Sequence, residues 1–293
     1  MIERQDIQFL SSGLKCVGWF YRTLESDNAP CIVLAHGFGG VKEMRLDAYA
    51  QRFAEAGYNA LVFDYRYFGE SEGEPRQILD IKKQHEDWHA AIRYARGLAG
   101  VDPRKIVLWG TSFSGGHVVA VAVQDKEIAA AISQVPHMSG FATAAATGPV
   151  QNIRLGFAAW RDLANKLLNR KPYYVPIIGQ PGELSAMNAP GVVEGVNRLY
   201  PDGFRPNEVV AARIFLSVGL YSPGWLAPKL NIPWLVQVAA NDLTTPVNPA
   251  IKAARKAPKG QLIIYNCGHF DVYVQPGFEQ TINDQIKFLH NCL

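Results

Sequence analysis

The sequence predicts an α/β fold, in which a mostly parallel, doubly wound sheet carries helices on both faces. Three observations lead to this prediction. Near-continuous apolar runs rich in Val and Ile recur along the chain, amphipathic stretches separate them, and one long segment breaks the alternation. Fully apolar runs of strand length are typical of parallel strands buried on both faces, and strand–helix–strand alternation predicts right-handed βαβ units.

The elements follow in order along the chain. Two short β-like stretches, DIQFL and LKCVGWFYR, come first. Six apolar runs are then predicted as strands, over residues 31–37, 59–65, 105–110, 128–136, 233–241 and 261–266. Between residues 80 and 98, apolar side chains recur at spacings of three and four, which predicts a helix with one buried face. Residues 247–257 and 277–291 are also predicted as helices.

Residues 139–226 interrupt the alternation between the sixth and seventh strands, and they are rich in Ala, Gly, Pro and aromatic residues. A segment of this length is too long for an ordinary loop. We therefore expect an inserted cap with some helices, over the C-terminal edge of a core made of residues 1–138 and 227–293. Its large side chains suggest an apolar lid over a pocket or the cap's own core, and the sequence leaves both open: Trp160, Tyr173, Tyr174, Met187 and Trp225.

Bulk properties limit the class of protein. The formal net charge of +3 is small and the Lys and Arg residues are dispersed, so we expect no nucleic-acid partner. We find neither a secretory signal nor an apolar run of the ~20 residues that a membrane span needs. The four cysteines form no C-x-x-C pair, which argues against a disulfide framework or a Cys-rich zinc site. These features predict a cytoplasmic protein and leave a homo-oligomer open.

The stretch WGTSFSGG at 109–116 follows a predicted strand and precedes a predicted helix. This is the context of a nucleophile elbow, a sharp turn that needs small residues two places before and after the nucleophile. For Ser112 those positions hold Gly110 and Ser114, and for Ser114 they hold Ser112 and Gly116. The strand ends at Gly110, so we predict Ser112 at the tip. Serines that only cap a helix are the structural alternative.

A serine nucleophile needs a base that is itself oriented by a carboxylate. Asp242 directly follows the predicted strand 233–241, and His269 lies just after the next strand, 261–266. The chain order Ser, Asp, His is that of one class of serine hydrolases. Taken together, the three positions predict a catalytic triad of Ser112, Asp242 and His269.

The glycine-rich stretch HGFGG at 36–40 follows another predicted strand. Acyl transfer needs hydrogen-bond donors aimed at the oxyanion, and the glycines let the backbone turn so that the Phe38 N–H points into the site. The Phe113 N–H, next after the nucleophile, is the second predicted donor. Neither phosphate-binding glycine pattern is present, which excludes that use of the loop.

The stretch HEDWH at 85–89 matches the zinc metalloprotease pattern H-E-x-x-H. Asp87 puts a charge inside the motif, and His85 falls on the apolar stripe of a helix that packs on the sheet. We therefore interpret the match as a coincidence on a structural helix. Asp64 and Glu43 also lie near strand ends, and we expect Asp64 to be structural.

Together, HGFGG, FDYRYFGES, WGTSFSGG, AAND and CGHFD resemble the α/β-hydrolase superfamily, over about residues 15–138 and 228–290. The similarity is to bacterial esterase-type and dienelactone-hydrolase-like members, with some X-Pro dipeptidyl-peptidase-like character. It implies the triad Ser112, Asp242 and His269 with the oxyanion hole of Phe38 and Phe113. Two residues depart from the family pattern: Ser114 and Tyr67 both stand where Gly is usual.

These features predict a serine hydrolase for a small-molecule acyl substrate, with a carboxylic ester as the substrate and no metal or organic cofactor. An acyltransferase, a thioesterase and an X-Pro-type peptidase use the same triad and stay open as alternatives. A non-catalytic or metal-dependent protein is the rival outside this class. Acyl chain length and leaving group are beyond what the motifs specify.

Overall fold

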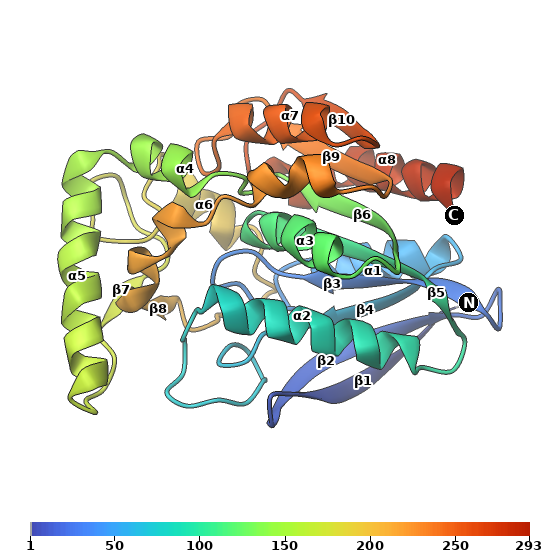
Figure 1. The fold of residues 1–293 in the computed structure, drawn as a ribbon, viewed down its shortest axis with the longest axis horizontal. Coiled ribbons are helices and arrows are strands. Elements are labelled where there is room, and N and C mark those ends of the chain that lie inside the picture. Colours follow the sequence, from blue (N-terminus) through green and yellow to red (C-terminus); the bar gives the residue numbers. More distant parts are fainter. Residues whose placement is uncertain (1) are drawn as a thin grey trace.

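The computed structural model describes residues 2–293 and is built on an eight-stranded sheet of order β1-β2-β4-β3-β5-β6-β9-β10 (Figure 1). β1 pairs antiparallel with β2, and β2 antiparallel with β4. The remaining pairs are all parallel, from β4 through β3, β5, β6 and β9 to β10. The strands are β1 (Ile2–Ser11), β2 (Leu14–Thr23), β3 (Ala29–Ala35), β4 (Asn59–Phe63), β5 (Val101–Thr111), β6 (Ile128–Gln134), β9 (Trp234–Ala239) and β10 (Gly260–Tyr265).

Helices cover both faces of this sheet, as the apolar strand runs predicted. The helices are α1 (Leu46–Glu55), α2 (Ile81–Arg96), α3 (Phe113–Gln124), α7 (Val247–Lys256) and α8 (Gly277–Cys292). One apolar cluster joins the sheet to α2, α3 and α7, and a second joins it to α1 and α8. In β3, Val33 belongs to the first cluster and its neighbours Ile32 and Leu34 to the second, and all three are fully buried. The predicted α/β fold is therefore confirmed.

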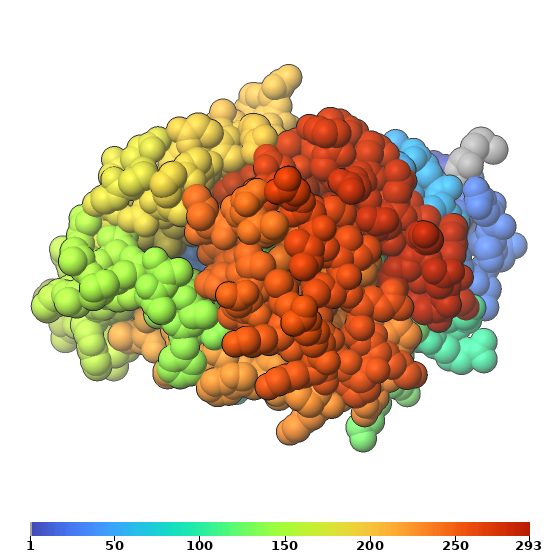
Figure 2. All heavy atoms as spheres, turned by 90° about the horizontal axis from the view of Figure 1, so that it is seen from above, coloured from blue at the N-terminus to red at the C-terminus, as the bar shows by residue number. Residues whose placement is uncertain are grey.

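Between β6 and β9 the chain runs through residues 139–226, the stretch predicted as an insertion, which makes up one end of the molecule beside the C-terminal part of the chain (Figure 2). We keep the name inserted segment for this stretch. Its elements are α4 (Gly140–Thr147), α5 (Pro149–Leu167), β7 (Tyr174–Pro176), α6 (Val192–Asn197), β8 (Val209–Ala211) and the 3₁₀ helices η1 (Ala212–Leu216), η2 (Val218–Leu220) and η3 (Pro223–Lys229), the last of which runs past residue 226. β7 and β8 pair antiparallel in a sheet of their own. Across residues 2–293, the structure has no helix long and apolar enough to span a membrane.

A buried ion pair supports the loops that follow β3 and β4. The Lys42 ammonium lies 3.1 Å from Asp64 Oδ2, and the Lys42 N–H donates to Asp64 Oδ1 at 2.7 Å. Both side chains are fully buried. The expectation that Asp64 is structural agrees with this geometry, since Asp64 lines neither of the two cavities described below.

Candidate active site

Ser112 lies at the junction of β5 and α3, with φ 53° and ψ −116°, which side-chain-bearing residues rarely adopt. Two backbone hydrogen bonds hold this turn: the Ser112 N–H donates to Gln134 O at 2.9 Å, and the Ser112 carbonyl accepts from His137 N at 2.8 Å. A Cβ on Gly110 would lie 2.3 Å from Ser114 O, so the approach requires glycine there. Ser112 precedes the helix, but its side chain makes no capping hydrogen bond.

The second candidate serine points elsewhere. Ser114 is in the first turn of α3, is fully buried and shares a short hydrogen bond with the Tyr65 hydroxyl. That hydroxyl also accepts from Trp88 Nε1 at 2.8 Å. Ser112 lines both cavities at the end of the sheet, and Ser114 lines neither. The geometry therefore favours Ser112 as the serine that a ligand can reach.

Asp242 and His269 are brought together by the loops after β9 and β10. His269 Nδ1 lies 2.6 Å from Asp242 Oδ2, and both side chains are almost fully buried. The backbone N–H groups of Thr244 and Thr245 each donate to Asp242 Oδ1 at 2.7 Å, and Thr245 Oγ1 donates to Oδ2. Burial alone would raise the pKa of Asp242, but His269 and these hydrogen bonds lower it below its usual value. The carboxylate is thus held ionised against the imidazole.

Ser112 and His269 both line a small cavity of about 60 Å³. The His269 loop is tied down by Asp271, whose carboxylate accepts from Gly268 N at 2.8 Å and from Arg198 Nη2 at 2.8 Å. Arg198 follows α6, so the inserted segment helps to fix the loop that carries His269. The imidazole edge that is not bonded to Asp242 is the one available to a reacting group.

The loop after β3 lies directly against Ser112. A Cβ on Gly37 would come within 2.9 Å of Ser112 Cβ, and Gly39 has φ 67°, so this close turn depends on glycine. The Phe38 ring packs edge-on to the Phe113 ring, with centroids 5.5 Å apart. In residues 2–293 the structure gives neither the Phe38 nor the Phe113 amide a hydrogen-bond partner. Both amides therefore have a free donor beside Ser112.

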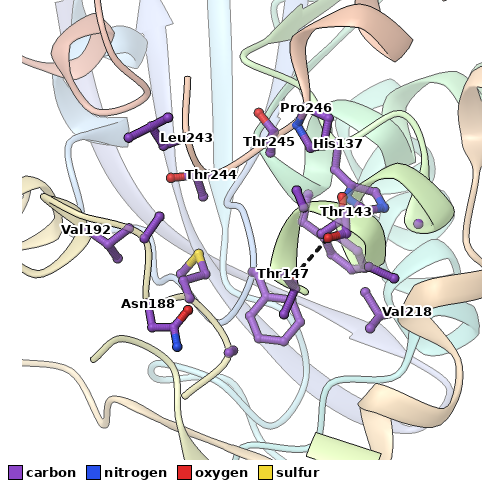
Figure 3. Close-up of a pocket in the computed structure, with 18 of the residues that line it drawn as sticks. His137, Thr143, Thr147, Asn188, Val192, Val218, Leu243, Thr244, Thr245 and Pro246 are labelled. Carbon is purple, nitrogen blue, oxygen red and sulfur yellow. Dashed lines mark hydrogen bonds between the residues drawn. The ribbon is translucent and has the colours of Figure 1, made fainter. Parts of the chain in front are cut away.

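The larger of the two cavities that Ser112 lines has a volume of about 810 Å³, and we call it the main cavity (Figure 3). Much of its wall comes from the inserted segment, and most of its lining surface is apolar. Its inserted-segment lining comprises Gly140, Thr143, Ala144, Ala146, Thr147, Asn152, Leu155, Ala186, Met187, Asn188, Ala189, Pro190, Val192, Phe215, Val218 and Gly219. Polar side chains, among them Thr143 and Asn188, are interspersed among these groups (Figure 3).

The five large side chains that were expected to form either a lid or the core of the cap lie in different environments. Met187 lines the main cavity, and Tyr173 packs on the small apolar cluster of the inserted segment. The Tyr174 hydroxyl donates to Arg76 O at 3.0 Å. Trp160 and Trp225 are 64% and 71% exposed, so neither interpretation describes them.

His137 is a cavity residue that the sequence motifs did not single out. It follows β6, its Nε2 donates to Tyr221 O at 3.1 Å, and its Nδ1 accepts from Thr143 Oγ1 at 3.2 Å. Burial lowers the pKa of His137 to about 4, so it is neutral near pH 7. Its position just past a parallel strand, at the edge that carries Ser112, is the signal that identifies it.

The histidines of HEDWH serve the packing of α2. His85 Nε2 lies 3.0 Å from His117 Nδ1 and 3.1 Å from the Tyr221 hydroxyl, while His89 Nε2 contacts Gln124 Oε1 at 3.0 Å. Within residues 2–293 no group of three or more His, Cys, Asp or Glu side chains is placed to hold a metal ion. Both histidines of the motif therefore have hydrogen-bonding partners within the protein.

The buried histidines make stability depend on pH. Burial lowers the pKa of His85 from 6.5 to about 4, and burial also depresses that of His117. Between those two pH values the unfolded chain binds protons that the folded chain rejects, so stability falls as pH is lowered. We expect Tm to decline over this window and His85→Gln to flatten the decline. His89→Gln, on the same helix, is the control. If Tm fell equally steeply with pH in both variants, the buried His85 would not be the source of the decline.

Tyr67 stands where the family pattern has glycine, and its backbone conformation explains why glycine is usual there. Tyr67 has φ 75°, which favours glycine, and its hydroxyl lies 2.6 Å from the Lys83 ammonium. Its ring packs against Gly73, where an added Cβ would lie 2.4 Å from the ring. The Tyr67 ring is thus buried and has its own partners in this loop.

The chain is similar in sequence to known proteins over nearly its whole length. The sequence profile of the Alpha/beta hydrolase family matches residues 32–279. Quorum-quenching protein AidA of Acinetobacter baumannii (strain MDR-ZJ06) is 44% identical over 284 residues, which cover 97% of this chain and 93% of AidA. Polyketide transferase ATR5 of Stachybotrys chlorohalonatus (strain IBT 40285) is 29% identical over 304 residues, covering 100% and 99%.

A solved structure agrees with the sequence relatives. The crystal structure of the alpha/beta hydrolase GrgF from Penicillium sp. sh18 superposes with a TM-score of 0.85 at 25% identity, covering 99% of both chains. The chain therefore belongs to the α/β hydrolase family and is an enzyme of that family.

Proposed function

We propose that this enzyme is a serine hydrolase that cleaves a carboxylic ester through an acyl-enzyme, with Ser112, His269 and Asp242 as its catalytic triad. The observation that carries the proposal is the 2.6 Å contact between His269 Nδ1 and Asp242 Oδ2, beside a serine that shares a small cavity with the imidazole. The strained backbone of Ser112 and its missing capping bond also support a catalytic role.

In the first half of the reaction, His269 Nε2 takes the Ser112 hydroxyl proton as Oγ attacks the ester carbonyl carbon. Asp242 holds the imidazole in the tautomer with the proton on Nδ1 and stabilises the imidazolium that forms. The tetrahedral intermediate then expels the alcohol, which takes the proton from Nε2. Ser112 keeps the acyl group as an ester.

In the second half, a water molecule replaces the alcohol and passes a proton to His269 as it attacks the acyl-enzyme. The collapse of the second intermediate returns that proton to Ser112 and releases the carboxylic acid. In both halves the Phe38 and Phe113 amides would hold the oxyanion, and one such donor is worth about 10²–10³ in turnover. The steps need no metal or organic cofactor.

The acyl group is proposed to occupy the main cavity, because that cavity is large and mostly apolar and Ser112 is in its wall. Each methylene buried contributes about 0.8 kcal/mol, which corresponds to about a fourfold change in kcat/KM. We expect kcat/KM for p-nitrophenyl esters to rise with acyl length from acetate until the cavity is filled. A preference for acetate, or activity on X-Pro amides with none on esters, would contradict the proposal.

The wall of the cavity offers a matched pair of variants. Ala144 lines the cavity and the next residue of α4, Ala145, is exposed and does not. Ala144→Phe is expected to lower kcat/KM for long acyl esters about 10-fold or more and to spare acetate, because an aromatic ring would take up acyl volume. Ala145→Phe should leave the whole series unchanged. Kinetics across the ester series measure both.

Acyl transfer to an alcohol is the second candidate, since it uses the same triad and the relative ATR5 is named a polyketide transferase. Water and an alcohol would then compete for the same acyl-enzyme. Product analysis with added alcohol separates the two: a hydrolase releases mainly free acid, whereas a transferase gives mainly the new ester.

A further inference from the structure

Helix α5 has two apolar faces on opposite sides. Its inner face packs on the rest of the protein through the buried Leu155, Ala158 and Ala159. A helix at the surface of a globular protein ordinarily has one such stripe and turns its other side, which is polar, to solvent. On the opposite side of α5, a row of apolar side chains points outward, and the helix forms the border of the molecule (Figure 1).

We call this row the α5 seam; it consists of Val150, Ile153, Phe157, Trp160, Ala164 and Leu167. Val150 is 70% exposed, Phe157 75% and Leu167 76%. Intervals of three and four residues alternate along the seam, which is the spacing that a helix uses to pair with another helix in a coiled coil. The seam does not contact the enzyme's own core, so a helix that pairs with it would come from another molecule.

Three charged side chains of α5 interact with other groups of the enzyme. Arg154 Nη1 donates to Gly182 O at 2.7 Å, and the Arg161 guanidinium lies over the Tyr173 ring, 4.1 Å from its centre. Asp162 is buried and paired with Arg213. The seam itself therefore contains no charged side chain, and the two arginines at its side already interact with groups of the enzyme. This arrangement favours a partner with an equally uncharged stripe.

The seam is also large enough for a stable contact. At the exposures of Phe157 and Trp160, 75% and 64%, the two rings alone offer roughly 300 Å². That already reaches the largest apolar patch of a typical monomer, about 300–600 Å². With the four aliphatic residues added, the seam approaches the ~800 Å² that each partner buries in a standard interface.

We propose that two copies of this chain pair through the α5 seam, with the two helices antiparallel. The series of intervals, three, four, three, four, three, reads the same in both directions, so the seam is self-complementary about a two-fold axis. The axis would pass between Phe157 and Trp160, which then stack on Trp160 and Phe157 of the second copy. Ile153 would face Ala164 of the second copy, a large residue against a small one.

Pairing at this place would also arrange the two active sites. The inner side of α5 contributes Asn152 and Leu155 to the main cavity. The two main cavities would therefore lie on opposite sides of the paired helices, each facing away from the contact. The dimer leaves both cavity walls complete. The proposed pairing is also independent of the proposed ester hydrolysis.

Sedimentation velocity of the full chain at about 10 µM tests the pairing. We expect a dimer mass, and a monomer mass for the double variant Phe157→Glu/Trp160→Glu with circular dichroism unchanged. Trp225→Glu, which alters an equally exposed tryptophan outside α5, should stay dimeric. A monomeric parent, including one that binds anionic phosphatidylglycerol vesicles through α5, would overturn the proposal, as would a double variant that stays dimeric.

Cysteine pairs test the orientation, which matters if the glutamate variant fails to fold. The double variant Ile153→Cys/Ala164→Cys should form an intermolecular disulfide under mild oxidation. Each single variant should not, because in the antiparallel pair residue 153 lies ~16 Å along the axis from its own equivalent. The parent, with its four native cysteines, is the control. Cross-linking by either single variant, or none by the double variant, would refute the antiparallel seam.

Discussion

Replacing Ser112 by alanine is expected to lower kcat/KM for ester hydrolysis by about 10⁴–10⁶-fold. The loss is this large because the variant has no atom that can carry the acyl group, and the oxyanion donors alone give only a small residual rate. Steady-state kinetics on the best p-nitrophenyl ester measure the loss. Folding should be little affected, since the Ser112 side chain makes no capping hydrogen bond.

Ser114→Ala is the matched control, two residues away and with the same change of side chain. Its hydroxyl bonds only the buried Tyr65, so the variant should keep activity within a few-fold. It should lose about 1–3 kcal/mol of unfolding free energy, because a buried hydroxyl is left short of a partner. A large loss of activity in Ser114→Ala together with an active Ser112→Ala would reverse the assignment of the nucleophile.

Replacing Asp242 by asparagine is expected to lower kcat by about 10⁴-fold near pH 7. The carboxylate accepts from His269 Nδ1 at 2.6 Å, and an amide in its place would turn a donor toward that nitrogen or lose the charge that stabilises the imidazolium. The proton would then sit on Nε2, where His269 cannot accept the Ser112 proton. The kcat of the variant, measured over pH, reports this loss.

Asp271→Asn gives the matched control for this change, in the loop that carries His269. Its carboxylate accepts from Gly268 N and from Arg198, and an amide oxygen can still accept one of these bonds. We expect a loss of less than about 10-fold, because Asp271 only positions the loop. Equal losses for the two variants would show that loop placement, rather than the charge on Asp242, sets the rate.

The parallel strands and the order of the proposed triad could be predicted from the sequence because both depend on local patterns. In β3, every residue from Cys31 to Ala35 is buried, so the strand is apolar throughout and easily recognised. The sheet brings the ends of parallel strands to one edge, which places the loops after β5, β9 and β10 together. The observed strand bounds differ from the predicted ones by a few residues. β5, for example, begins at Val101, which pairs with Ala29.

The main cavity could not be predicted in the same way. Its wall combines α4, α5 and the loop around Met187, which come together only through the packing of the inserted segment. Helix α1, which no predicted helix covered, is amphipathic over only ten residues. Large side chains such as Trp160 look like core residues in the sequence, and only the structure shows that they point outward.

One measurement tests the central claim most directly: a crystal structure of the enzyme after reaction with an alkyl fluorophosphonate, which mimics the tetrahedral intermediate. We predict phosphorus bonded to Ser112 Oγ, with the phosphoryl oxygen within hydrogen-bonding distance of the Phe38 and Phe113 amides. We also predict His269 Nε2 beside Oγ and the alkyl chain in the main cavity. A covalent bond to any other residue, or an adduct on Ser112 with His269 out of reach, would contradict it.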